Sequence, residues 1–570
     1  MAIWRIILVI VMVGLAVGCA SSQRPTSSER TLAVAAAPAV QKRITVAVRS
    51  NPPNLNSTLS GTAIGKVPGV PEIEQLVHTG LEVLDDQGRR RAQLAETLPD
   101  TTNGLWRVFP DGRMETVWKI RPNASWHDGV PLTAADLAFT LTVVQDRSLS
   151  AFRNQTYDLI EGIDVEDPRT AVVRWKRPFI DADTMFSAGL AIPLPKHLLE
   201  QAYSQDPATL LDLPYWNREF VGAGPFKIRE WVDGSHIMLD ANAAYALGRP
   251  KIDSVEIMFI PDNNTIVANL LAGRVHVTLG RGISTEQGLG LRAQWAAGHM
   301  DLTYGNAVAL YPQFINPNPP VLTDVRFRRA LMHAIDRQQL ADSLMAGLAP
   351  IAESILDPKD ALYPTTQRDI VRYPYDLRMT AQALETLGYG KGPDGNYRDA
   401  ANQRLTVEIQ GVTTTDINEK SMLAVADAWQ QAGLGGEAAP IPVQRQGDRE
   451  FRATRSGFDL AGGGSGRVGM IRWRSSDAPL AETNFVGGNK TRYMNPEFDT
   501  LVDRYLTTIP RDENAQIVGE IVHHISDQLV VMGLVYDAQA TMIANRLVNA
   551  NGNVPTDGAA TWNVHDWDVR

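Results

Sequence analysis

Cysteine is almost absent from this chain of 570 residues, which holds a single one, Cys19. One thiol cannot form an internal disulfide, so no disulfide framework stabilises the fold. Histidine is also scarce, at 10 residues, and the metalloprotease pattern H-E-x-x-H does not occur. No block of Lys or Arg stands out and the formal net charge is −10, which argues against nucleic acid as a partner.

The N-terminal residues form a separate segment. Arg5 precedes an apolar run from Ile6 to Val17, and small residues follow, which is the order of a secretory signal. This run is shorter than the roughly 20 apolar residues of a membrane span. The stretch Leu15–Cys19 resembles a bacterial lipobox, in which the cysteine becomes the lipidated first residue. We expect residues 1–19 to be a signal peptide with a lipobox; a plain signal peptide is the alternative.

The rest of the chain is typical of a soluble protein with mixed α/β structure. Residues 20–42 are rich in Ser, Ala, Pro and Thr and predict a flexible tether. Short β-branched runs such as "ITVAV" and "AVVRW" predict strands. A helix is expected after Thr133 as N-cap, and another near Asp324, because apolar residues recur there at helical spacing. A chain of this length needs more than one hydrophobic core.

Five blocks resemble, in order, the family-5 extracellular solute-binding proteins, which are the dipeptide, oligopeptide and nickel receptors of ATP-binding-cassette (ABC) importers. The resemblance spans nearly the whole mature chain. The blocks are "VWKIRPNASWHDGVPLTAADLAFTL", "FVGAGPFKIREW", "PKIDSVEIMFIPDNNTIVANLLAGRVHV", "DVRFRRALMHAIDRQQL" and "YMNPEFDTLVDR".

This resemblance implies the class II periplasmic binding protein fold, a two-lobed, three-domain flytrap with mixed α/β sheets flanked by helices. The chain would start in domain I, leave for domain II, return, build domain III and end in domain I. The expected bounds are 43–75, 221–305 and 535–570 for domain I, 76–220 for domain II and 306–534 for domain III.

The pair His127-Asp128 has the residue types of a metal or acid–base site. Adjacent residues point in different directions, however, so a metal would need further ligands from elsewhere. The sequence "HDG" suits a turn in which Asp128 bonds locally and Gly129 takes a positive φ. We expect a structural role for this pair.

Three other motifs fall short of a catalytic site. Gly464–Gly469 satisfies G-x-G-x-x-G, but "MIRWRSSDAP" follows it, which predicts no helix, so we expect a Gly-rich loop. The family resemblance implies that this loop lies at the lip of the cleft and can touch the solute. Ser465 lacks the second Gly of a nucleophile elbow. His523-His524 lies in a helical pattern, where solvated or capping histidines are the default. We therefore expect no enzyme and no cofactor.

The resemblance supplies candidate ligand-binding residues in two places outside the Gly-rich loop. Asn51 and Pro52 fall in a segment whose family counterpart reaches ligand; an ordinary turn is the alternative. Asn316 ends the expected entry strand of domain III, and satisfying backbone groups is its alternative role.

The clearest departure from the family surrounds Trp473. Peptide-binding relatives often carry Trp-x-x-Asp here, in which the Trp walls the cleft and the Asp pairs with the peptide's amino terminus. In this chain Ser476 takes the fourth position and Asp477 comes one residue late. Arg472 and Arg474 flank the Trp and would suit a carboxylate or phosphate. The six expected ligand contacts outside Asn51 and Pro52 are Asn316, Arg472, Trp473, Arg474, Ser476 and Asp477.

The resemblance implies an extracytoplasmic protein that captures a peptide-like or other small solute by hinge closure and delivers it to an ABC permease. We expect a monomer that touches the membrane only through the lipid on Cys19, either in the periplasm or on the outer face of the cytoplasmic membrane. Two rivals stay open: a sensor or envelope-assembly factor without transport, and an exported hydrolase.

Overall fold

The computed structural model describes residues 41–570 apart from a few short segments; Cys19, the signal and nearly all of the tether lie outside the described residues, as does Ser465. The segments left out are 61–66, 150, 153–155, 189–190, 414–415, 464–465 and 556–557. Residues Gln41–Arg570 form one unit.

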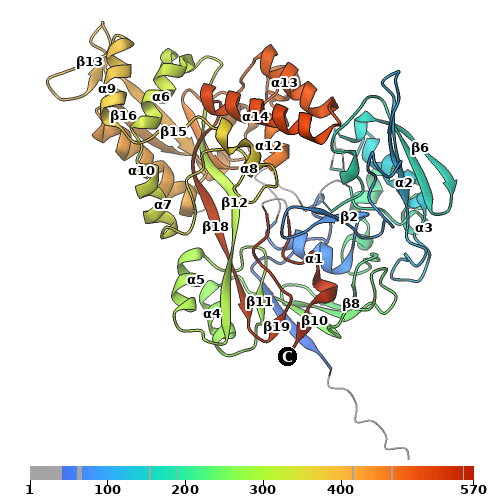
Figure 1. The fold of residues 1–570 in the computed structure, drawn as a ribbon. Helices are drawn as coiled ribbons and strands as arrows, with labels where there is room; N and C mark the ends of the chain where they lie inside the picture. Colours follow the sequence, from blue (N-terminus) through green and yellow to red (C-terminus); the bar gives the residue numbers. More distant parts are fainter. Residues whose placement is uncertain are drawn as a thin grey trace, which may run out of the picture. The chain divides into compact units, whose positions relative to one another are not determined.

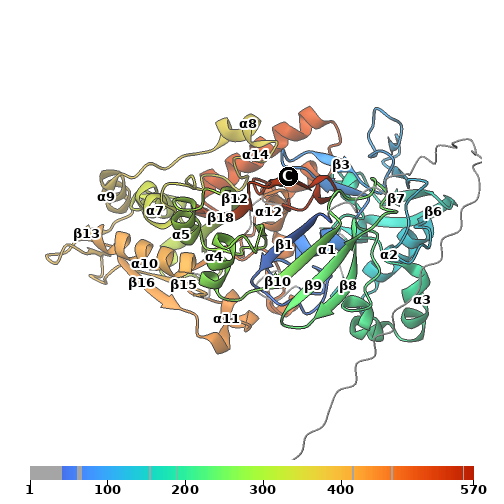
Figure 2. The same cartoon turned by 90° about the horizontal axis from the view of Figure 1, so that it is seen from below.

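A ten-stranded mixed sheet organises the molecule. Its strand β1, "RITVAV", is buried on both faces from Val46 to Val48, so this end of the strand is a continuous apolar run. In spatial order the strands are β16 (Gly435–Pro440), β15 (Thr406–Gly411), β17 (Phe458–Gly462), β12 (Gly298–Pro312), β18 (Met532–Ala544), β11 (Val277–Thr278), β1 (Arg43–Val48), β10 (Ser254–Phe259), β9 (His236–Ala241) and β8 (Phe226–Val232). Figure 2 shows β1, β10, β9 and β8 side by side.

The long strands β12 and β18 join the two halves of this sheet (Figure 1). They pair antiparallel from Gly298–Ala544 to Leu310–Met532. At one end β18 pairs with β11, and at the other end β12 pairs with β17. The register between β12 and β18 shifts twice, between Tyr304 and Ala307 and again between Val308 and Ala309. Such irregularities bend a strand pair, so the connection between the halves is curved at its middle.

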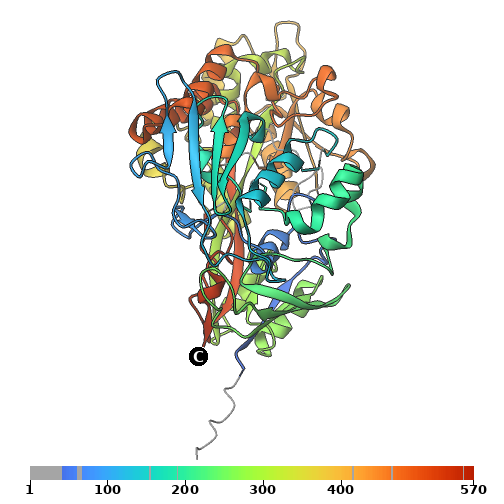
Figure 3. The ribbon, with the colours of Figure 1, turned by 90° about the vertical axis from the view of Figure 1, so that its right-hand side faces the viewer.

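A separate antiparallel sheet of four strands lies outside the large sheet (Figure 3). Its order is β4 (Trp106–Val108), β5 (Met114–Lys119), β7 (Thr170–Trp175) and β6 (Ile160–Asp167). Trp118 and Trp175 are fully buried in its core, and Trp175 Nε1 donates to Thr116 Oγ1 at 3.0 Å. The helix α2 (Ala134–Gln145) packs on β6 and β7, and its expected start at Thr133 is confirmed by a capping box with Asp136.

Helices cover both halves of the large sheet. The expected helix at Asp324 is confirmed: α6 begins at Val325, and the Asp324 carboxylate accepts from Arg326 N. None of the helices in the described residues is both long enough and apolar enough to span a bilayer. The other main helices are α1 (Val70–Val77), α3 (Lys196–Gln205), α4 (Asn263–Leu271), α5 (Thr285–Arg292), α6 (Val325–His333), α7 (Arg337–Met345), α9 (Leu377–Thr386), α10 (Asp416–Gln431), α13 (Pro496–Thr507) and α14 (Arg511–Gln528).

Candidate functional site

A large cleft of about 3380 Å³ runs through the described part of the molecule. Side chains from both halves of the large sheet, from the connecting strands and from the part of the chain with the four-stranded sheet line it. They include Glu82 and Asp183 from that part, Asp537 from β18 and Lys490 from the segment before α13. Pockets for single small molecules are usually 300–1,000 Å³. The cleft is therefore roomy enough for a solute larger than a typical metabolite.

His127 and Asp128 lie in a turn next to residues 222–224, which lead into β8 of the large sheet. Gly129 has a φ of 91°, and Asp128 Oδ1 accepts from Val130 N at 3.1 Å, which confirms the expected turn. The His127 ring lies between Gly222 N and Gly224 O, at 3.3 and 3.1 Å. Burial lowers the pKa of His127 to about 4, so the ring is neutral near pH 7. The ring thus ties the turn to the backbone at 222–224.

The first two binding candidates, Asn51 and Pro52, do not face the cleft. Their neighbours Arg49 and Ser50 line the cleft. Asn51 instead donates a hydrogen bond to Asp233 at 2.9 Å. Asn316 lies in an exposed turn after β12, with a φ of 52° and no place in the described cleft lining.

The segment around Trp473 turns most of its side chains away from the cleft. Trp473 is 1% exposed and stacks on Tyr311 with ring centroids 5.5 Å apart. Arg474 points toward Asp503, at 3.7 Å. Ser476 is exposed and Asp477 is half-buried, and neither belongs to the described cleft lining.

Of the Trp473 group, only Arg472 lines the cleft. It ends a short helix, α12 (Gly466–Arg472), where the sequence predicts no helix. The prediction of a loop was wrong because tertiary packing, with Met470 fully buried in the core, stabilises a turn of helix that its Gly and Arg residues alone do not favour. Gly462, Gly463 and Gly466 line the cleft, so the Gly-rich segment does lie at the cleft.

Cationic side chains from two other segments, around Arg452–Arg455 and at Lys490, meet beside Arg472. Arg452 lies 3.5 Å from Asp459 on β17. Lys490 Nζ sits 5.2 Å from the centre of the Tyr311 ring. Arg455 Nη2 donates to both Tyr311 O and Lys490 O at 2.8 Å, which fixes the position of Lys490. The sequence does not reveal this group, because Arg472 and Lys490 lie 17 to 38 residues after Arg452 and Arg455.

The part of the chain with the four-stranded sheet brings acidic side chains to the cleft. Arg90 bridges Glu82 at 3.3 Å and Asp183 at 3.6 Å. Burial raises the pKa of Glu82 to about 7, despite the opposing attraction of Arg90. On β18, Asp537 pairs with Arg281 at 2.7 Å.

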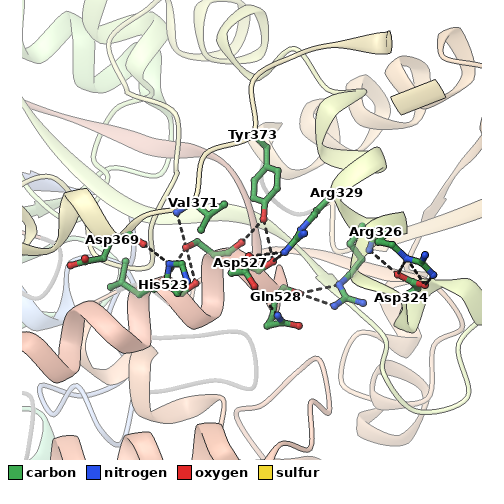
Figure 4. A network of polar contacts seen from close by, with 12 residues as sticks. Asp324, Arg326, Arg329, Asp369, Val371, Tyr373, His523, Asp527 and Gln528 are labelled. Atoms are coloured by element: carbon green, nitrogen blue, oxygen red, sulfur yellow. Dashed lines mark hydrogen bonds and ion pairs between the residues drawn. The ribbon is translucent and has the colours of Figure 1, made fainter. Parts of the chain in front are cut away.

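Away from the cleft, the C-terminal end of α14 belongs to a polar network that serves packing (Figure 4). Arg329 donates to Asp527 at 2.6 Å, and Tyr373 OH donates to Asp527 O at 3.1 Å. His523 Nδ1 lies 3.2 Å from Asp369 O, and His524 Nε2 lies 3.1 Å from Tyr493 OH. The two histidines thus have structural partners.

Comparison with known proteins places this geometry in a family. The family model of bacterial extracellular solute-binding proteins, family 5, matches residues 96–468. The oligopeptide-binding protein AppA of Bacillus subtilis is 26% identical over 368 residues, 64% of this chain and 63% of that relative, so less than two thirds of its length is matched.

Solved structures confirm the expected fold class. The structure of Bacillus subtilis AppA with a nonapeptide is 20% identical, with a TM-score of 0.70 over 93% of this chain and 99% of that one. NikZ from Campylobacter jejuni with Ni(L-His) is 20% identical, with a TM-score of 0.70 over 92% and 99%. At such identities the likeness shows the fold alone. Since the family match covers more than half of the sequence, this chain belongs to the bacterial extracellular solute-binding proteins of family 5.

Proposed function

We propose that this protein is an extracytoplasmic lipoprotein that captures a peptide-like or other small solute in the interlobe cleft and delivers it to an ABC permease. The observation that carries the proposal is the cleft itself, a space of about 3380 Å³ lined by side chains of both lobes in a family-5 fold. A solute that contacts both sides stabilises the closed form over the open one and so shifts their populations.

The connecting strands suggest how the lobes close. β12 and β18 run between the halves of the large sheet, and their register shifts fall near the middle of the pair. Closure about a few such positions is the hinge motion that periplasmic binding proteins as a class display. Residues 222–224 form a second connection, which leads from the part of the chain with the four-stranded sheet to β8 of the large sheet. The neutral rings of His127 and His78 hold this connection.

The size of the cleft favours a peptide-like solute over a single small ion. One relative is an oligopeptide-binding protein whose structure holds a nonapeptide, and another structure holds Ni(L-His). The family therefore includes both kinds of solute, and only the larger one would occupy much of this volume.

Further parts of the proposal rest on the sequence. We propose that Cys19 carries the lipid anchor, that the domains have the bounds expected above, and that the protein acts as a monomer without enzymatic activity. Of the sequence-derived ligand contacts, we retain Arg472 and the Gly-rich segment as candidates, because they line the cleft.

Native mass spectrometry of freshly purified protein tests the proposed function. We expect a noncovalent solute that leaves unaltered on denaturation. A thermal-shift screen of peptide pools, metal chelates and anions is the companion assay, because a ligand at 100 times its Kd adds about 2.7 kcal/mol of stability. No bound solute and no shift with any of these classes would contradict the proposal.

A further inference from the structure

The charges of the cleft are segregated by region. In the described lining between residues 412 and 490, cationic side chains outnumber acidic ones by six to two. The cations are Lys420, Arg449, Arg452, Arg455, Arg472 and Lys490, and the acids are Asp416 and Asp459. In the rest of the described lining, acidic side chains such as Glu82, Asp183 and Asp537 outnumber cationic ones. The cleft thus has one electropositive wall within an otherwise acidic surround.

Two half-buried cations of this wall, Arg472 and Lys490, have no ion pair with any residue that the structure describes. Neither the Arg472 guanidinium nor the Lys490 ammonium makes a hydrogen bond or ion pair with any described residue; Lys490 has only its contact with the Tyr311 ring. Both side chains are half-buried. Two acids are close enough to attract them: Asp459, which lies 3.5 Å from Arg452 and acts on Lys490, and Asp477, which acts on Arg472. With Arg452 and Arg455 beside them, the four cations still outnumber these two acids, so the group carries an excess of positive charge.

The cost of this arrangement points to a ligand. Burial lowers the pKa of Lys490 to about 8; the attraction of Asp459 opposes this shift, and repulsion by Arg452, Arg472 and Arg455 adds to it. Partly buried charges without partners are unfavourable, and a carboxylate or phosphate would relieve both desolvation and repulsion through charge-assisted hydrogen bonds.

The wall also has room for such a group. A Cβ atom added at Gly462 or Gly463 would meet no atom within 4 Å, and both glycines line the cleft beside Asp459 on β17. The backbone therefore leaves open space next to the cations, which a bulkier residue would fill.

We propose that Arg472 and Lys490 bind an oxyanion of the solute, a carboxylate or a phosphate, so that the solute lies with its negative end against residues 452–490. This inference rests on the proposed function, since it concerns the same cleft. In a peptide the oxyanion is its terminal carboxylate; in a free anion it is the whole ligand. The polarity differs from that implied by the family resemblance, in which an Asp of this region holds an amino group.

The test compares matched ligands on matched variants. Isothermal titration measures a pool of pentapeptides with free carboxyl termini, the same pool with amidated termini, citrate and inorganic phosphate. The variants are Lys490→Gln, Arg472→Gln, the conservative Lys490→Arg, and Arg504→Gln, which removes an exposed cation paired with Glu520 outside the cleft. Thermal melting of each variant confirms that it is folded.

We expect the wild type to bind the free-acid pool on the order of tenfold or more tightly than the amidated pool. Both Gln variants should lose this preference, while Lys490→Arg and Arg504→Gln keep it. Equal binding of both pools by the wild type and by folded Gln variants would overturn the oxyanion site but leave the proposed function standing.

The other outcomes separate the two proposals further. Binding of citrate or phosphate alone, abolished in the Gln variants, would support the oxyanion site and identify a free anion as its source, against the peptide-like part of the proposed function. Binding that the Gln variants do not weaken would place the anion elsewhere and overturn the inference. Binding of none of the four probes would overturn it as well, whereas a copurified solute seen by mass spectrometry would still support the proposed function.

Discussion

At the scale of single residues, the buried histidines that hold residues 222–224 must have a defined protonation state. His78 is 2% exposed; its Nδ1 accepts from Thr79 N and Ala223 N, so its Nε2 carries the proton and donates to Pro193 O at 2.8 Å. The two bonds that Nδ1 accepts require the neutral ring. The imidazole therefore holds the backbone at Pro193 and Ala223 together, next to the connection at residues 222–224.

Lowering the pH should reduce the stability that the bonds of His78 contribute. Burial lowers the pKa of His78 from 6.5 to about 3, so below pH 6.5 the unfolded chain takes up the proton first and the folded state loses stability. The stability advantage of the wild type over His78→Asn should shrink by on the order of 2 kcal/mol between pH 7 and pH 5. Urea unfolding at both pH values measures it.

His299→Asn, which removes an exposed histidine, is the control for the loss of one histidine from the chain. An advantage for the wild type that is constant or grows toward pH 5 would show that His78 is not neutral in the fold.

Trp473 should contribute to stability and not to binding. Because the side chain is 1% exposed and stacked on Tyr311, Trp473→Ala should cost roughly 3–5 kcal/mol of unfolding free energy, and Trp473→Phe clearly less. Chemical denaturation measures this. A stable Trp473→Ala variant that fails to bind solute would instead place the indole in the ligand site.

At the scale of elements, helix starts carry contacts between segments that are distant in sequence. The Asp136 carboxylate accepts from Thr133 N at 2.8 Å and from Lys196 N, at the start of α3, at 2.9 Å. Asp136 is 4% exposed, so one side chain caps α2 and fixes α3 beside it.

Asp136→Ala should therefore destabilise the protein more than an ordinary cap substitution. It leaves two partly buried backbone N–H groups without acceptors, for an expected cost of roughly 2–4 kcal/mol. Asp262→Ala, at the exposed N-cap of α4, is the matched control and should cost about 1 kcal/mol. Equal losses in the two variants would contradict the bridging role of Asp136.

Such local signals explain what the sequence could predict. The cap at Thr133, the turn at Gly129 and the helix start at Asp324 depend on neighbouring residues, and the structure has them as expected. The helix after Gly466 and the burial of Trp473 depend on packing against Tyr311 and other distant residues, so local patterns mislead there.

At the scale of the whole molecule, the site is assembled from segments that are distant in sequence and are brought together by the large sheet. β1 pairs with strands that lie more than 200 residues away, and β12 with a strand near the C-terminus. The cationic wall likewise unites Arg452, Arg472 and Lys490 from separate segments. No spacing rule in one sequence reveals such neighbours, which is why the family resemblance predicted the fold but not the charged wall.

Membrane attachment is a separate property of the full chain. If Cys19 is lipidated, Cys19→Ser should move the protein from the membrane fraction to the soluble extracytoplasmic fraction without altering solute binding. Fractionation with an immunoblot measures this. Equal membrane retention of both forms would rule out the cysteine as the anchor.

Small-angle X-ray scattering tests the central claim of solute capture by closure most directly. The purified protein, freed of solute by unfolding and refolding, is measured alone and with the free-acid pentapeptide pool at saturation. We predict a smaller radius of gyration with the pool, because the solute draws the lobes together around the cleft. A pool that binds by titration yet leaves the scattering profile unchanged would contradict closure as the mechanism of capture.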